Sequence, residues 1–223
     1  MRLFRRGPTK LFVWDFHGVL ERGTEHAVFE ITNAVLARCG YGERLAVEDN
    51  EHLYGRKWYE YFAHALPHEP PEKHLMLQRL AFEFSDAHPR VVGRHLSATE
   101  YAEEVLAKVA ARHEQILLSN SRPGALRQFL QSVGLLHFFN DGTLHGLDGH
   151  RPDQARSKPD ALAEYIRNKS FKDVIVIGDS LKDIELALAY NGVSYLYRHP
   201  GRSHPPSSAT YKISDLREVL REV

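Results

Sequence analysis

Four short apolar segments, at residues 11–14, 116–118, 174–177 and 193–197, constrain the fold of this 223-residue chain more than any other feature. Each is rich in strand-forming residues and lacks the polar alternation of a half-exposed strand. Such strands are typical of a parallel sheet that is covered on both faces. Helical patterns separate them, and one is expected to begin at the capping box Ser97 to Glu100. The alternation predicts an α/β fold with a doubly wound parallel sheet.

One long segment interrupts this alternation. Residues 25–89 contain only helical patterns, punctuated by prolines. A stretch of this length is too long for a simple connection between neighbouring strands. We therefore expect a discontinuous core, residues 1–21 and 98–223, with an inserted α-helical subdomain at residues 22–97.

Composition excludes several classes of function. The 29 lysines and arginines balance the 29 aspartates and glutamates, so no net charge favours nucleic acid or an anionic membrane. No apolar run approaches the roughly 20 residues that span a bilayer, and a cytoplasmic protein is expected. Cys39 is the only cysteine, which excludes an internal disulfide, and its helical surroundings predict a buried side chain. The sequence does not indicate an oligomeric state.

Residues that could carry chemistry follow three of the predicted strands or begin a helix. In open α/β sheets the site lies at the carboxyl ends of the strands. Taken singly, each residue has an ordinary structural explanation, such as a strand-end cap, a turn or a charge at a helix start. Together, several carboxylates beside an amine and a hydroxyl indicate a site for a divalent cation and a phosphate. The residues are Asp15, Ser119, Asn120, Lys158, Asp179 and Asp183.

These residues stand in four motifs. They are Asp-Phe-His-Gly-Val-Leu at residues 15–20, Ser119-Asn120, Lys158-Pro159, and Gly178-Asp179-Ser180 followed by Asp183. In this order the motifs resemble those of the haloacid dehalogenase superfamily, and the resemblance extends along nearly the whole chain. It implies a Rossmann-like core, a helical cap inserted between the first and second motifs, and hydrolase activity of the phosphatase type.

The resemblance also implies a metal site. Mg²⁺ would be held by the carboxylate of Asp15, the main-chain carbonyl of His17, and Asp179, with Asp183 binding directly or through water. These are the hard oxygen ligands that Mg²⁺ prefers. Magnesium is therefore the expected cofactor.

The resemblance further implies covalent catalysis on a phosphate ester. Asp15 would attack phosphorus, and water would then hydrolyse the aspartyl phosphate. Ser119 and the main-chain N–H groups near Asn120 would hold the phosphate oxygens. Lys158 would neutralise charge between the nucleophile and the phosphate.

His17 departs from the family pattern, in which phosphatases carry a second aspartate two residues after the nucleophile. Three interpretations are open. His17 could serve as the acid and base, because imidazole exchanges protons near neutral pH. It could instead only position the phosphate in a slower enzyme. Its presence could also mark a regulatory protein, or one that binds a phosphate ligand without turnover.

The inserted helices resemble a cap that closes over the site and selects the substrate, which favours a small phosphomonoester. Arg56 or Lys57 would bind an anionic part of that substrate, unless the two form only a solvated basic pair at a helix start. A lesser alternative is cleavage of a carbon–phosphorus bond, with Lys57 forming a Schiff base. Trp58 is expected in the core of the subdomain. The motifs set the reaction type and leave the substrate open.

Overall fold

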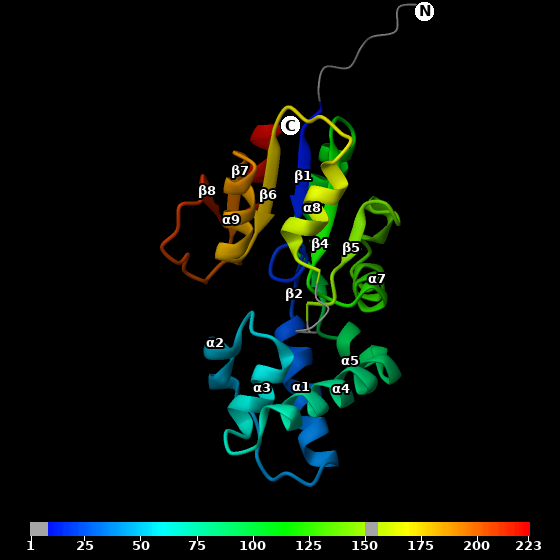
Figure 1. Cartoon of the computed structure of the whole chain (residues 1–223), viewed down its shortest axis with the longest axis vertical. Coiled ribbons are helices and arrows are strands. Elements are labelled where there is room, and N and C mark those ends of the chain that lie inside the picture. Colours follow the sequence, from blue (N-terminus) through cyan, green and yellow to red (C-terminus); the bar gives the residue numbers. More distant parts are fainter. Residues whose placement is uncertain (1–8, 150–155) are drawn as a thin grey trace, which may run out of the picture. The chain divides into compact units, whose positions relative to one another are not determined.

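The computed structural model describes residues 9–149 and 156–223 of the chain. It divides into two compact units, Met1–Arg22 with Ala98–Val223, and Gly23–Ser97 (Figure 1). The first unit contains a sheet with helices and is called the core unit below. The second is built of helices and is called the helical unit.

The core unit is built on a six-stranded sheet. The strands are β1 (Leu11–Trp14), β4 (Glu114–Ser119), β5 (Leu144–Gly146), β6 (Val174–Gly178), β7 (Val193–Tyr197) and β8 (Tyr211–Ile213). Their order is β5-β4-β1-β6-β7-β8, and all neighbours are parallel. Figure 1 shows β1, in blue, between β4 and β6. The chain builds outward from β1 in both directions, so the loop after β1 lies at the switch point of the sheet. The predicted α/β class with a parallel sheet is confirmed.

Helices cover both faces of this sheet. Phe12 and Trp14 pack in a cluster with side chains of α6 (Ala102–Ala110), α7 (Pro123–Ser132) and the 3-10 helix η3 (Leu216–Glu222). Leu11 and Val13 pack in a second cluster with α8 (Lys158–Ile166) and α9 (Leu181–Ala189). All four side chains of β1 are buried, which explains why this segment shows no polar alternation.

The helical unit has its own apolar core. Its elements are α1 (Thr24–Arg38), η1 (Val47–Asp49), α2 (Asn50–Leu53), α3 (Trp58–Ala65), α4 (Pro71–Ala87) and α5 (Pro89–Gly93). Leu36, Phe62 and Leu77 are fully buried. Trp58 is buried as predicted, and its Nε1 donates to Oγ1 of Thr32 at 2.9 Å. Among the described residues, no helix has both the length and the apolar character needed to cross a bilayer.

Two local predictions were wrong. Ser97–Ala98 is the short strand β3, which pairs with β2 (Glu21–Arg22), and the helix begins only at Ala102. The main-chain N–H of Thr99 donates to the carbonyl of Leu20 at 2.9 Å, so the chain is still extended where the capping box was expected. Cys39 is exposed because it caps the carboxyl end of α1, where the helix stops and the chain turns away.

Candidate active site

Asp15 stands directly after β1 at the carboxyl edge of the sheet. Its main-chain N–H donates to the carbonyl of Ile177 at 2.9 Å, which continues the pairing with β6. The N–H of Phe16 donates to Oδ1 of Asp15 at 2.8 Å and leaves Oδ2 for other partners. The chain then turns through Gly18, whose φ is 73°, a left-handed conformation that favours glycine.

Lys158 joins two of the predicted carboxylates. Its Nζ lies 2.9 Å from Oδ2 of Asp15 and 2.7 Å from Oδ1 of Asp183. The lysine is the first residue of α8, where the helix dipole disfavours a cation. Burial lowers the pKa of Lys158. The negative charges and hydrogen bonds of Asp15 and Asp183 have a larger effect in the opposite direction, so the pKa is raised. The ammonium therefore stays charged between the two carboxylates.

The three carboxylates of Asp15, Asp179 and Asp183 form a cluster. One ligand oxygen from each lies within 4.8 Å of the others. Asp183 is buried and is oriented by Ser180, whose N–H and Oγ donate to Oδ2 at 3.2 Å and 2.6 Å. Burial and the charges of Asp15 and Asp183 raise the pKa of Asp179 to about 7. A divalent cation would relieve this crowding of negative charge, so the oxygen-donor set fits Mg²⁺.

The loop Ser119-Asn120-Ser121 follows β4, which is the neighbour of β1. Its three carbonyls accept hydrogen bonds from the main-chain N–H groups of residues 147, 149 and 148 at 2.8, 2.8 and 3.2 Å. Ser119 is buried, and its Oγ accepts from the N–H of Ser121 at 3.3 Å. The loop backbone is therefore fixed at the same sheet edge as Asp15.

The imidazole of His17 is held on both nitrogens. Its Nδ1 lies 2.7 Å from Oε1 of Glu21, and its Nε2 lies 2.7 Å from Oγ of Ser121. Burial lowers the pKa of His17, but the hydrogen bond and charge of Glu21, with the charges of Asp15 and Asp179, raise it above the usual value. His17 therefore belongs to the same electrostatic cluster as the predicted nucleophile and metal ligands.

Arg56 and Lys57 lie in the helical unit, at the start of α3. Both side chains are exposed, and Nη1 of Arg56 lies 3.3 Å from Oε1 of Glu60. The main-chain N–H of Lys57 donates to Oε2 of the same glutamate at 2.7 Å. These contacts stabilise the beginning of the helix, and a role in substrate binding stays a prediction.

Three further residues belong to the surroundings of this cluster and were missed from the sequence. They are Glu21 and Ser121, which hold His17, and Arg198, whose charge lowers the pKa of Asp179. Glu21 follows His17 by four residues, a spacing that a single turn brings together. Arg198 directly follows β7. Its position at the carboxyl end of a predicted strand could therefore have marked it as a site residue.

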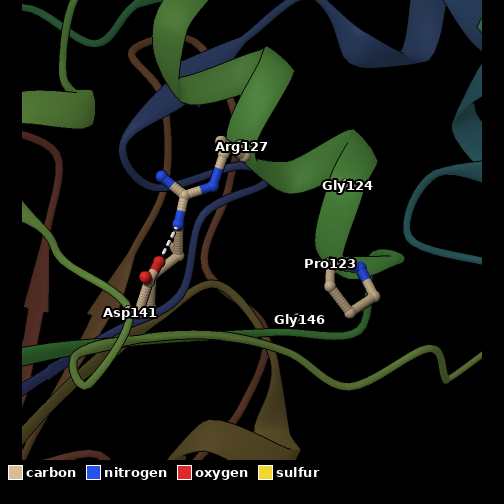
Figure 2. Close-up of a pocket in the computed structure, with 6 residues that line it drawn as sticks. Pro123, Gly124, Arg127, Asp141 and Gly146 are labelled. Atoms are coloured by element: carbon tan, nitrogen blue, oxygen red, sulfur yellow. Dashed lines mark hydrogen bonds and ion pairs between the residues drawn. The ribbon is translucent and has the colours of Figure 1, made fainter.

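A separate small pocket lies beside the start of α7. Its volume is about 260 Å³, and it is lined by Pro123, Gly124, Arg127, Asp141, Leu144 and Gly146. Figure 2 shows Arg127 and Asp141 joined by an ion pair across it. None of the predicted site residues lines this pocket.

The comparison with protein families decides the classification. The family model of haloacid dehalogenase-like hydrolases matches residues 9–191. The chain belongs to this family. The match covers all four motifs, so the family predicted from the motifs is confirmed, and with it the class of enzyme, a hydrolase. No curated protein matches the chain significantly.

Solved structures of haloacid dehalogenase-like proteins share the fold. A predicted phosphoglycolate phosphatase from Haemophilus somnus is 15% identical with a TM-score of 0.74, and the match covers 96% of this chain and 97% of that one. A family hydrolase from Deinococcus radiodurans, with bound phosphate and sodium, is 21% identical with a TM-score of 0.64, and the match covers 95% and 93%. At these identities the likeness shows a shared fold.

Proposed function

We propose that this haloacid dehalogenase-like hydrolase is a Mg²⁺-dependent phosphatase of small phosphomonoesters that works through an aspartyl phosphate on Asp15. The observation that carries the proposal is the ammonium of Lys158, placed 2.9 Å from Asp15 and 2.7 Å from Asp183 beside a third carboxylate. Lys158 opposes the raise in the pKa of Asp15 that burial and Asp183 cause, and it offers positive charge to an incoming phosphate.

The proposed reaction has two steps. In the first, Oδ2 of Asp15 attacks phosphorus in line, the phosphorus–oxygen bond to the leaving group breaks, and the leaving oxygen takes a proton. In the second, water attacks the phosphorus of the aspartyl phosphate, gives up a proton, and releases inorganic phosphate and the Asp15 carboxylate. Ser119 and the N–H groups near Asn120 hold the phosphate oxygens, and Lys158 balances their charge.

Magnesium fits the carboxylate cluster on chemical grounds. Asp15, Asp179, Asp183 and the carbonyl of His17 would hold it with oxygen donors only. The bound ion neutralises charge on the transferred phosphoryl group. The raised pKa of Asp179 supports this assignment, because the raise reflects burial together with the nearby negative charges of Asp15 and Asp183.

His17 supplies the proton chemistry in this proposal. Its ring gives a proton to the leaving oxygen and takes one from the attacking water, the two tasks of the aspartate that it replaces. The contact of Nε2 with the loop after β4 supports this role, since that loop also carries the phosphate-binding residues. The bound phosphate in the similar hydrolase from Deinococcus radiodurans is consistent with an anion in such a fold. Arg56 and Lys57 are proposed to bind a second anionic group of the substrate.

The test is phosphate release from a panel of small phosphomonoesters. Wild type is compared with Asp15→Asn, in Mg²⁺ and in EDTA. A matched control is Asp141→Asn, which makes the same change on an exposed residue of the core unit. Release that requires both Mg²⁺ and Asp15 and survives in the control supports the proposal. Mg²⁺ and phosphate binding without any release would identify a binding protein instead.

A further inference from the structure

We infer that Glu21 and Ser121 are positioning residues that hold the imidazole of His17 in one orientation and one tautomer for proton transfer. The inference rests on the proposed function and deepens it, because neither residue belongs to the four motifs. Both contacts are 2.7 Å long. Together they place a carboxylate at one ring nitrogen and a hydroxyl at the other.

Glu21 decides which ring nitrogen carries the hydrogen. A carboxylate only accepts, so Nδ1 donates to Oε1 and leaves Nε2 as the nitrogen that exchanges a proton. The carboxylate is well placed to fix the ring because its own backbone is fixed. The N–H of Glu21 donates to the carbonyl of Phe16 at 3.3 Å, and its carbonyl accepts from Nε2 of His199 at 3.2 Å.

Ser121 suits the other nitrogen in both of its states. A hydroxyl can donate or accept, so it can donate to bare Nε2 and accept from protonated Nε2 without moving the ring. Ser121 is buried and belongs to the loop proposed to hold the phosphate. The exchanging nitrogen therefore faces the loop where the phosphate is expected.

Two aromatic rings restrict the imidazole further. The ring centroids of Phe16 and Phe129 lie 5.0 Å and 5.6 Å from that of His17, both in edge-on geometry. This packing limits rotation of the ring, so the two hydrogen bonds select between its few remaining orientations. If Glu21 only balanced charge, the orientation of the His17 ring would not matter. The observed orientation, with Nδ1 toward Glu21 and Nε2 toward the loop after β4, supports a positioning role instead.

The experiment compares two leaving groups with the full chain and Mg²⁺. p-Nitrophenyl phosphate releases a stable anion and needs little protonation, whereas an alkyl phosphate, such as glycerol phosphate, releases an alkoxide and depends on the acid. Glu21→Gln is expected to lower kcat/KM, which reports the step that releases the leaving group, by about 100-fold for the alkyl ester and to leave kcat/KM for the p-nitrophenyl ester within about threefold. Glu21→Asp should recover part of the loss, and Ser121→Ala should show the same selectivity more weakly. Glu25→Gln in α1 is the control.

Nuclear magnetic resonance of the His17 ring nitrogens tests the positioning itself, independently of turnover. Wild type is expected to carry hydrogen on Nδ1, with a downfield proton that disappears in Glu21→Gln. Hydrogen on Nε2 alone in wild type would overturn the inference. Equal loss of kcat/KM on both esters in Glu21→Gln would also overturn it. In either case, Asp15-dependent release by wild type would leave the proposed function standing. Absence of Asp15-dependent release would overturn both.

Discussion

Gly178, the last residue of β6, leaves the space that the side chain of Asp183 occupies, and we expect Gly178→Ala to impair the metal site. A Cβ at this position would lie 2.1 Å from Cγ of Asp183. Carbon atoms in contact are separated by about 3.5 Å, so the carboxylate would have to retreat by about 1.4 Å. That displacement would move Asp183 away from its place beside Lys158 and Asp15.

The size of the effect follows from this displacement. Misplacing a reacting group by about 1 Å costs on the order of 100-fold in rate, or about 2.7 kcal/mol. We expect a similar loss in Mg²⁺-dependent phosphate release, together with weaker Mg²⁺ binding. Overpacking should also lower the free energy of unfolding by about 1–3 kcal/mol.

Calorimetric titration with Mg²⁺, thermal unfolding and phosphate release measure these effects. Gly124→Ala is the matched control, because a Cβ at that position in α7 meets no atom within 4 Å. If Gly178→Ala bound Mg²⁺ and released phosphate within about threefold of wild type, the argument from this close contact would be refuted.

Two further predictions concern the charges of the cluster. Lys158→Met keeps the side-chain length and removes the ammonium, which leaves Asp15 and Asp183 buried without their cation. We expect about 3–5 kcal/mol of destabilisation in EDTA by chemical unfolding, and an unchanged unfolding midpoint would contradict the ion-pair argument. The pKa of Asp179 is raised to about 7, so its contribution to stability is present below the unfolded value and is lost as pH rises through 7. Because Mg²⁺ replaces the proton, its stabilising shift in Tm should be larger at about pH 8 than at about pH 6; equal shifts would argue against carboxylate ligation.

The central part of the fold was predictable from the sequence, because strands that are buried on both faces lack the polar alternation of half-exposed strands. β1 and β7 have the predicted bounds, since both are dominated by strand-forming side chains and are almost wholly buried. β5 was missed because its three residues, Leu144–Gly146, include a histidine and a glycine and are only half-buried. The start of α6 was misplaced because pairing of β3 with β2 keeps Ser97–Ala98 extended.

The candidate site was predictable only where a motif carried it. The structure brings Asp15, Asp179, Asp183 and Lys158 together, and their spacing in the sequence already placed each beside a strand or at a helix start. Ser121 could not be assigned in the same way. Its contact with His17 spans 104 residues of sequence and depends on β1 and β4 being neighbours in the sheet.

The order of the strands also has a consequence for biosynthesis. β1 leaves the ribosome early, but its two neighbours are β4 and β6, and Leu11 pairs with Glu114 on one side and Val174 on the other. Pairings between such distant segments form late in folding. The nucleophile is thus made long before the lysine and the carboxylates that surround it. A nascent chain cannot assemble this site until it has been synthesised through Asp183, so formation of the site would report that β4 and β6 have paired with β1.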